Sequence, residues 1–574
     1  MRTQLFAEKE NIKENINSDS FLKKQLYGIE KDAEVFLKEP VCSLRYSDFK
    51  IFYETGSRKE YEYEYFYHRR RLNDFAILAA VYKDNSKYFQ HLQDAVWAVL
   101  DEFTWALPAH IPFKSSSEEI KTHIDLFAAE TAFTLAEISV LFEGRFDKAV
   151  EERIKYEVRK RIIEPYLEGR KNSWDELKNN WSAVCAGSVG SAFLYLAEDS
   201  EVKAVLPRLF NTLNCYLEGF GDDGACVEGL NYWIYGFGYF TYFAQLLYEY
   251  TGGEENLFEN PKVRNIALFP QKIYFKNNKT VSFSDCGNKF MHRYGLMNFL
   301  AHKYNGVIVP DNSSALNFDG DTCYRFAHLI RDFVWRGRTE KSEKTERSSF
   351  EYFKDAQWYV KTCGAYEFAA KAGRNNESHN HNDVGSFLLN VNGRSIITDP
   401  GRGEYTADYF SEKRYEYFAP SALAHSVPVI NGNSQKEGEM RFGKILEADN
   451  NRLVIEFEKA YDDNSLQKLV RTFEFFSDKI IITDNVKFNK DQNIITEHFV
   501  FEEKPEVFDD GLKAGGIYMS YDTDIFNCTI SEKTFAANYD TYKTVYTADL
   551  ECMADMEKEI KFEINLSGED KDEQ

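Results

Sequence analysis

Cysteine is scarce in this sequence and is not arranged in pairs. The chain has 574 residues and only nine cysteines, an odd number, with no CxxC spacing among them. This pattern argues against a disulfide framework and indicates reduced thiols, as in a cytoplasm. The N-terminal segment MRTQLFAEKENIKENINSDS lacks the apolar run of a signal peptide, which also favours a cytoplasmic protein. A secreted or periplasmic location is the alternative if a signal has been removed.

Long hydrophobic runs and an excess of positive charge are also missing. No stretch approaches the apolar length that spans a bilayer, so we expect no membrane partner. The net charge is -23. A field of this sign does not attract polyanions, so nucleic acid is not an expected partner. A polyanionic glycan would need a local basic cleft, for which His68 to Arg71 is a candidate; the alternative is a solvated helix face.

Aromatic side chains, in contrast, are abundant. The sequence contains 36 tyrosines and 47 phenylalanines. Such a surplus is common in sugar-binding sites, where flat rings stack on pyranose faces. It is equally explained by a large core together with a compositional bias. The length indicates two or three domains.

The hydrophobic period changes once along the chain. From about Asp74 to Trp335 the pattern predicts repeated helix pairs, which can stack into a solenoid or close into a toroid. Residues 336–350 are charged and predict a linker. The segments that follow are short and rich in β-branched and aromatic residues, which predicts an antiparallel sandwich. We therefore predict an N-terminal extension of open role over 1–60, a helical domain over 61–335 and a β domain over 351–570.

The densest polar cluster, Glu377 to Asp383, lies just before an apolar strand. If this segment is extended, alternation places His379 and His381 on one face. With Asp399 and His425 from later in the chain, the histidines could form a zinc site with ligands from separate strands. The alternative is that the imidazoles bond backbone groups in a polar turn.

Asn180 precedes an apolar helix that contains small residues. It occupies an expected N-cap position, and capping is its simplest interpretation. Gly187 and Gly190 would allow close helix packing.

A glycine-rich turn runs into an aromatic helix over Asp222 to Gly236. Tyr232 and Tyr235 are three residues apart and share a helix face. Core packing, with a partner for each buried phenol, is the alternative to a functional role. Glu228 could be a first-turn charge that complements the helix dipole.

Taken together, these clusters resemble the heparinase II/III family of polysaccharide lyases. The resemblance rests on NNWxxVxxGxxG from Asn179, DDGxxxEGxxYWxYG from Asp222 and HNHNDVGSFLLNVNGRSIITDPGRGEYT from His379. It continues through RYEY from Arg414 and HSVPxING from His425. It implies a multidomain α-then-β fold: an incomplete (α/α) toroid followed by an antiparallel β-sandwich. It also implies β-elimination at the 4-linked bond of a uronic acid.

The resemblance assigns catalytic roles residue by residue. Asn180 matches the asparagine that binds the uronate carboxylate, and His379 matches the catalytic histidine. Tyr232 or Tyr235 matches the tyrosine that acts as base, acid or both. Tyr232 fits the local YW pattern, whereas Tyr235 better fits the distance from the asparagine and is the slightly favoured candidate.

The resemblance also implies a metal and substrate contacts. His381, Asp399 and His425 match the positions that bind one structural zinc per chain. Substrate contacts or site support are expected from four further residues: Glu228, Trp233, Tyr405 and Arg414.

The expected partner is an acidic oligo- or polysaccharide, first heparin, heparan sulfate or a related glycosaminoglycan oligosaccharide. A lyase for alginate, hyaluronan or a bacterial exopolysaccharide is the nearest alternative. A catalytically inactive glycan-binding protein on the same scaffold is the second alternative. A third is an (α/α) glycoside hydrolase, with Asp222, Asp223 and Glu228 as candidate carboxylates. The motifs leave open the sulfation pattern, endo or exo action, and whether a homodimer forms.

Overall fold

The computed structural model describes residues 5–335, 348–364 and 366–566. The chain divides into two compact units. The helical unit comprises residues 1–220, 232–267 and 291–344, and the β unit comprises residues 221–231, 268–290 and 345–574. Two short segments from the helical part of the sequence thus belong to the β unit. Most of the predicted linker, residues 336–347, lies outside the described residues.

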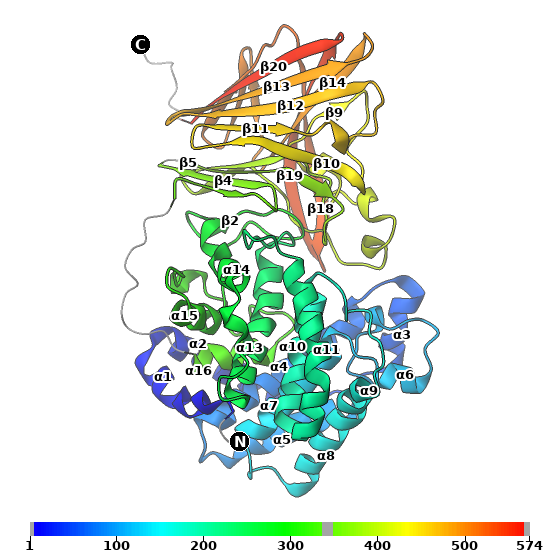
Figure 1. The fold of residues 1–574 in the computed structure, drawn as a ribbon, viewed down its shortest axis with the longest axis vertical. Helices are drawn as coiled ribbons and strands as arrows, with labels where there is room; N and C mark the ends of the chain where they lie inside the picture. Colours follow the sequence, from blue (N-terminus) through cyan, green and yellow to red (C-terminus); the bar gives the residue numbers. More distant parts are fainter. Residues whose placement is uncertain (1–4, 336–347, 365, 567–574) are drawn as a thin grey trace. The chain divides into compact units, whose positions relative to one another are not determined.

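Helices make up most of the helical unit (Figure 1). The α-helices of this part of the chain are α1 (Ile12–Ser18), α2 (Ser20–Phe36), α3 (Tyr46–Thr55), α4 (Lys59–Val81), α5 (Ser86–Asp101), α6 (Ser117–Lys121), α7 (Leu126–Leu141), α8 (Lys148–Val158), α9 (Glu164–Leu167), α10 (Asn180–Leu196), α11 (Asp199–Glu218), α12 (Leu230–Tyr232), α13 (Gly238–Tyr250), α14 (Pro261–Lys272), α15 (Tyr294–Lys303) and α16 (Phe326–Val334). A π-helical turn, η5 (Trp233–Phe237), joins α12 to α13.

Helix α10 packs against α7, α11 and α13, and α4 packs against α2 and α5. The small residues of α10 explain its close contact with α13. A Cβ atom on Gly187 would lie 2.8 Å from the carbonyl oxygen of Tyr239, and one on Gly190 would lie 2.4 Å from the ring of Phe243. The predicted packing role of both glycines is therefore confirmed.

The first α-helix begins well before Asp74, at Ile12. Helix α2 packs on α4, and Asn15 of α1 donates to the backbone carbonyls of Phe333 and Val334. Residues 5–60 are therefore part of the helical unit. The helical pattern just before Asp74 is hard to detect because the buried face of α4 carries tyrosine, histidine and arginine as well as aliphatic residues.

The basic stretch from His68 to Arg71 presents neither a basic cleft nor a solvated helix face. Arg69 and His68 are buried and both bond the carboxylate of Glu102, while Arg70 pairs with Asp32. The charges of Arg69 and Arg70 are therefore paired with carboxylates inside the helical unit. Both expectations for this stretch are wrong.

The β unit contains two large antiparallel sheets. The first has the order β15-β16-β17-β20-β13-β12-β11-β10-β6, and the second has the order β18-β19-β14-β8-β7-β5-β4-β3 with β9 paired to β14. The strands are β3 (Phe350–Phe353), β4 (Trp358–Cys363), β5 (Tyr366–Lys371), β6 (Gly373–Asn375), β7 (Phe387–Val391), β8 (Arg394–Ile397), β9 (Val429–Ile430), β10 (Gly438–Ala448), β11 (Arg452–Glu456), β12 (Leu466–Phe475), β13 (Lys479–Phe488), β14 (Asn493–Phe501), β15 (Glu506–Phe508), β16 (Gly511–Ala514), β17 (Ile517–Ser520), β18 (Asn527–Asn538), β19 (Thr541–Ala554) and β20 (Glu557–Asn565). A small hairpin of β1 (Tyr274–Phe275) and β2 (Lys279–Thr280) precedes them in the chain.

The two sheets enclose one aromatic core. Phe368 of β5 lies with its ring centroid 4.9 Å from those of both Phe473 and Phe475 of β12. Phe387 of β7 lies 5.2 Å from Phe473, again ring to ring across the two sheets. Alternating inward residues of both sheets thus interdigitate, as in a sandwich. The predicted α-then-β order and the antiparallel sandwich are confirmed.

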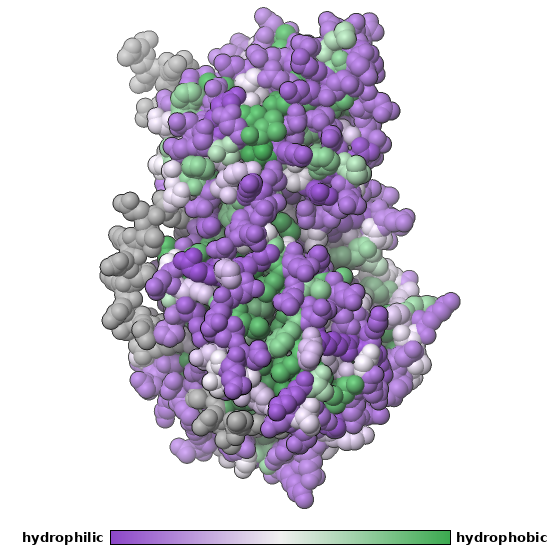
Figure 2. All heavy atoms as spheres, viewed as in Figure 1, coloured by the Kyte–Doolittle hydropathy of each residue, from purple (hydrophilic) through white to green (hydrophobic). Residues whose placement is uncertain are grey.

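Polar side chains dominate the visible surface. On the face drawn in Figure 2, hydrophilic residues predominate and hydrophobic ones lie in smaller groups between them. Among the described residues, no helix is long and apolar enough to cross a bilayer.

One buried cation joins the two sheets. Arg471 of β12 lies 2.5 Å from Asp484 of β13 and 3.0 Å from Glu497 of β14, measured from its Nη2 to a carboxylate oxygen. Its Nη1 donates to the backbone carbonyls of Gly385 and Ser426. All three charged side chains are fully buried.

We predict that Arg471→Leu lowers the free energy of unfolding of the β unit by about 3–5 kcal/mol, because it leaves two buried carboxylates without their cation. Lys487→Leu on β13 is the matched control: it breaks an exposed pair with Glu557 and should cost about 0–1 kcal/mol. Urea unfolding of both variants checks this. Equal effects would mean that the buried cation contributes no more than a surface charge.

Candidate active site and metal centre

The segment that carries His379 and His381 is a series of turns. Strand β7 begins only at Phe387, and His379 has a left-handed backbone with φ 57°. The predicted extended segment with both histidines on one face is therefore wrong, because a left-handed residue breaks the two-residue repeat. Both imidazoles nevertheless reach the same partner.

That partner is Asp285, a buried residue of the 268–290 segment. Its Oδ1 accepts from His381 Nε2 at 3.0 Å and from the Tyr409 hydroxyl at 2.8 Å. Its Oδ2 accepts from His379 Nδ1 at 2.8 Å, from Arg414 Nη2 at 3.0 Å and from the Tyr405 hydroxyl at 3.1 Å. Burial alone would raise the pKa of Asp285, but bonding to both histidines and the charge of Arg414 hold that pKa well below its usual value.

Two glycines let the chain bring Asp285 to this position. A Cβ atom on Gly401 would lie 2.6 Å from the carbonyl oxygen of Cys286, and one on Gly229 would lie 2.6 Å from the Cys286 Cβ. Both glycines also have positive φ angles, 73° and 93°. The Ser284 hydroxyl donates to the carbonyl of Val227 at 2.7 Å. The Asp285 segment is therefore in close contact with two loops that only glycine can form.

The opposite nitrogen of His379 lies near a second carboxylate. Its Nε2 is 3.7 Å from Glu228 Oε1, and the same oxygen accepts from the Ser378 hydroxyl at 2.9 Å. The His379 side chain is 15% exposed, whereas His381 is fully buried. His379 is thus the histidine of the pair that a substrate can reach. Tyr405 and Arg414, expected as substrate contacts or support, both bond Asp285.

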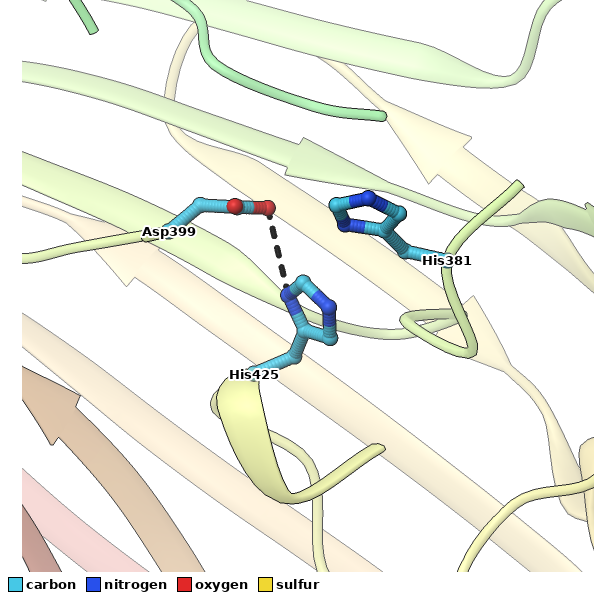
Figure 3. A group of neighbouring side chains, drawn as sticks. All are labelled: His381, Asp399 and His425. Atoms are coloured by element: carbon cyan, nitrogen blue, oxygen red, sulfur yellow. Dashed lines mark ion pairs between the residues drawn. The ribbon is translucent and has the colours of Figure 1, made fainter. Parts of the chain in front are cut away.

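The three predicted metal ligands form one buried cluster (Figure 3). Asp399 follows β8, and His425 follows a short 3-10 turn. One ligand atom from each of His381, Asp399 and His425 lies within 4.8 Å of the other two. His425 Nδ1 and Asp399 Oδ2 are 3.1 Å apart, and neither atom makes a hydrogen bond.

The hydrogen bonds of this cluster leave metal-binding atoms available. His381 uses Nε2 on Asp285, and His425 uses Nε2 on the carbonyl of Ala419 at 3.1 Å. The Nδ1 atoms of both histidines and Oδ2 of Asp399 are buried and have no hydrogen-bond partner. Two imidazole nitrogens and one carboxylate oxygen are a donor set that suits zinc, and imidazoles held at their other nitrogen are typical of metal ligands. The residues present therefore fit the implied metal.

Asn180 lies in the helical unit and is not a helix cap. It is the first residue of α10, and the N-cap is Asn179, whose side chain accepts from the backbone N–H of Trp181 at 3.1 Å. The capping interpretation of Asn180 is therefore wrong by one residue. Asn180 is buried, and a Cβ atom added to Gly236 would lie 3.1 Å from the Cβ of Asn180. The π-helical turn η5 thus packs directly against it.

Tyr235, on that turn, takes part in a charged network. Its hydroxyl donates to Glu130 Oε1, and Arg325 lies over its ring at 4.0 Å. Arg325 is 3.4 Å from Glu130 and 2.7 Å from Asp321, measured between nitrogen and carboxylate oxygen. Burial raises the pKa of Tyr235, and the nearby Glu130 raises it further, while Arg325 lowers it. The cation above the ring is the interaction that favours a phenolate.

The other two aromatic candidates differ sharply from each other in burial. Tyr232 is half-buried. Trp233 is 1% exposed, and its indole N–H donates to the carbonyl of Ile266 at 2.8 Å. Trp233 is therefore a core residue that packs on neighbours such as Phe237, and this burial argues against the predicted direct contact with substrate.

Asp223, one of the three candidate hydrolase carboxylates, has a structural role. Both oxygens of Asp223 accept backbone N–H groups: Oδ1 from Ala225, and Oδ2 from Asp355 and Ala356. A carboxylate used in this way fixes a loop, which disfavours the hydrolase alternative.

Comparison with known proteins supports the family resemblance. Residues 345–542 match the family described as Heparinase II/III-like, C-terminal. No curated protein matches the sequence. Among solved structures, heparinase III has a TM-score of 0.61 and 16% identity, covering 88% of this chain and 77% of that chain. The heparan sulfate lyase HepC from Pedobacter heparinus has a TM-score of 0.59 and 16% identity, covering 88% and 76%. The chondroitin AC lyase of Streptomyces coelicolor A3, in complex with chondroitin sulphate, has a TM-score of 0.57 and 9% identity, covering 98% and 83%.

At such low identity these likenesses establish the fold. The chain has the fold of the polysaccharide lyases that combine an (α/α) toroid with a β-sandwich. Within that fold, residues 345–542 match the model of the heparinase II/III-like C-terminal domain, in agreement with the resemblance found in the sequence motifs. The predicted polysaccharide-lyase class is thereby supported.

We predict that Glu130 makes the stability of the helical unit depend on pH. Burial raises the pKa of Glu130 from 4.5 to about 7, although Arg325 and Tyr235 lower it. Ionisation therefore costs the folded state more than the unfolded state. Below pH 4.5 the free energy of unfolding is not reduced by Glu130. As pH rises through 7 the ionisation of Glu130 lowers this free energy, by about 3 kcal/mol in total.

Glu130→Gln should remove that part of the pH dependence, measured as the free energy of unfolding of the helical unit between these two pH values. Parallel wild-type and variant profiles would contradict the prediction.

Proposed function

We propose that this protein is a polysaccharide lyase that cleaves a uronic-acid-containing glycan by β-elimination and leaves a 4,5-unsaturated uronate end. The observation that carries the proposal is His379, a partly exposed histidine held by a buried carboxylate within a heparinase II/III-like domain. The helical fold that accompanies this domain in the solved lyases supports the same conclusion.

The reaction breaks the C5–H bond and the C4–O bond and forms a C4=C5 double bond. The electron pair of the C5–H bond becomes the new π bond, and the glycosidic oxygen leaves with a proton. The C5 proton is only weakly acidic, so a donor must neutralise the C6 carboxylate while charge develops there. A base must take the C5 proton, and an acid must protonate the departing oxygen.

We assign one proton transfer to His379. Its Nδ1 bonds Asp285, so its Nε2 is the nitrogen that can exchange a proton with substrate. Glu228 lies on that side, 3.7 Å from Nε2. Its carboxylate would stabilise the imidazolium that forms when His379 takes up a proton.

We assign the carboxylate contact and the second proton transfer to the helical unit. The amide of Asn180 would donate to the uronate carboxylate. Tyr235 would transfer the other proton, supported by Arg325 over its ring and Glu130 on its hydroxyl. Tyr232 is the alternative, and its half-exposed ring favours access to substrate.

We further propose one structural zinc per chain at His381, Asp399 and His425. The ion would fix the turns that carry these residues to one another, and thereby the turn of His379 two residues away. The support is the convergence of three buried ligand atoms, none of which has a hydrogen-bond partner.

For the substrate we propose a heparan-type glycosaminoglycan oligosaccharide. Heparan sulfate lyases are among the solved structures with a similar fold, and cationic Arg402 lies over the Tyr405 ring at 4.6 Å. The net charge of -23 favours short acidic chains over long ones. Alginate, hyaluronan and bacterial exopolysaccharides are the other uronates to test.

We predict that a panel of these glycans yields an ultraviolet-absorbing product with the wild-type protein, because elimination creates a conjugated double bond. His379→Ala and Tyr235→Phe should each lower its rate of formation by about 100- to 10,000-fold while the protein stays folded. His302→Ala, an exposed histidine of α15, and Tyr542→Phe, an exposed tyrosine of β19, are matched controls that should behave as wild type.

The activities of the two tyrosine variants show whether Tyr235 or Tyr232 transfers the second proton. An active Tyr235→Phe with an inactive Tyr232→Phe would transfer the role to Tyr232. Activity in both would overturn the mechanism. Glycan binding without any absorbing product would indicate an inactive binding protein.

We predict about one zinc per chain by elemental analysis of the purified protein. His381→Ala should lose the zinc and melt at a lower temperature, because a ligand that binds only the folded state stabilises it. His302→Ala should retain the metal. A His381→Ala variant that lacks zinc but melts like wild type would contradict the structural role.

A further inference from the structure

Two histidines with different expected tasks bond one carboxylate through different nitrogens. His379 contacts Asp285 through Nδ1, and His381 contacts it through Nε2. Each contact uses a different carboxylate oxygen. Because an ionised carboxylate only accepts hydrogen bonds, each of these nitrogens must carry a proton.

The tautomer of each neutral histidine follows directly. His379 carries its proton on Nδ1 and keeps its lone pair on Nε2, the nitrogen that lies near Glu228. His381 carries its proton on Nε2 and keeps its lone pair on Nδ1, which is buried and makes no hydrogen bond. The first arrangement suits proton transfer and the second suits metal binding.

We propose that Asp285 is a positioning residue that fixes opposite tautomers of His379 and His381 and so couples the metal ligand to the proton-transfer residue. The consequences for zinc and for the rate rest on the function proposed above, whereas the tautomers themselves do not. Nothing in the sequence motifs marks Asp285, which lies about a hundred residues before the histidines.

The remaining partners of Asp285 limit it to this task. Tyr409 donates to Oδ1, while Tyr405 and Arg414 donate to Oδ2. With the two histidines, five donors share a carboxylate that offers roughly four lone pairs. Asp285 therefore has no acceptor capacity left for a metal ion or for a substrate proton. Arg414 also pairs with this carboxylate, with its Nη2 at 3.0 Å from Oδ2.

The direct test is nuclear magnetic resonance of protein labelled with ¹⁵N-histidine, which needs neither substrate nor metal. The chain has 11 histidines, so His379→Gln and His381→Gln spectra can assign the two signals. We expect the wild-type protein to show His379 protonated at Nδ1 and His381 protonated at Nε2. Asp285→Ala should shift at least one of them to the other tautomer or to a mixture.

Asp285→Asn is the second, isosteric variant, chosen in case the alanine variant does not fold. An amide offers one acceptor oxygen and one donor nitrogen. The oxygen should take the Oδ2 side, where Arg414, Tyr405 and His379 donate, so that the amide nitrogen faces His381 Nε2. We therefore expect zinc affinity, measured by chelator competition, to fall about 10- to 100-fold. With zinc in excess, kcat should fall less than in Asp285→Ala, and KM should stay unchanged in both.

Asp549→Asn is the matched control. Asp549 also accepts from a histidine Nδ1, that of His498 on β14, within the same unit but with no bond to the site residues. It should keep wild-type zinc affinity and kcat. Unchanged His379 and His381 tautomers in folded Asp285→Ala or Asp285→Asn would overturn the proposal, whatever the activity. Unchanged tautomer signals in an Asp285 variant would thus refute only the positioning role of Asp285. A wild-type protein that forms no lyase product would refute only the proposed function.

Discussion

The candidate site depends on the hydrogen bonds that the Asp285 carboxylate accepts from His379 and His381. This carboxylate is buried, it stays ionised because His379, His381 and Arg414 surround it, and it orients both histidines. Without this acceptor, two imidazoles only two residues apart would each be free to adopt either tautomer. The same carboxylate also receives Tyr405 and Tyr409, so the loop after β8 is fixed to the turn before β7. One charge thereby organises segments that are distant in the sequence.

The architecture of the β unit explains how this charge arrives there. Residues 221–231 and 268–290 come from the helical part of the sequence but pack with the sandwich. They bring Glu228 and Asp285 to the site of His379, which lies 94 residues after Asp285 in the sequence. The helical unit contributes its own charged network, in which Glu130 and Arg325 surround Tyr235. Each half of the proposed chemistry thus has a proton-transfer side chain beside a buried carboxylate.

Much of the fold was predictable because it rests on local patterns. The strands after residue 350 have clear β-branched and aromatic periods, and the glycines of α10 marked close helix packing. The first half of α4 was harder, since it buries tyrosine, histidine and arginine on its inner face. In the site, the spacing of His379, His381, Asp399 and His425 was informative because metal ligands and catalytic histidines form recognisable clusters. Asp285, Glu130 and Arg325 carry no such signal, because each acts through tertiary contacts. Trp233 shows the opposite case, because it lies in a recognisable motif but is a buried core residue.

The central proposal is that this protein cleaves its glycan by elimination and not by hydrolysis. Mass spectrometry of the products from a defined uronate oligosaccharide tests it most directly. Elimination adds no water, so the masses of the two products should sum to the mass of the substrate. Products whose masses sum to the substrate plus one water molecule would contradict the claim.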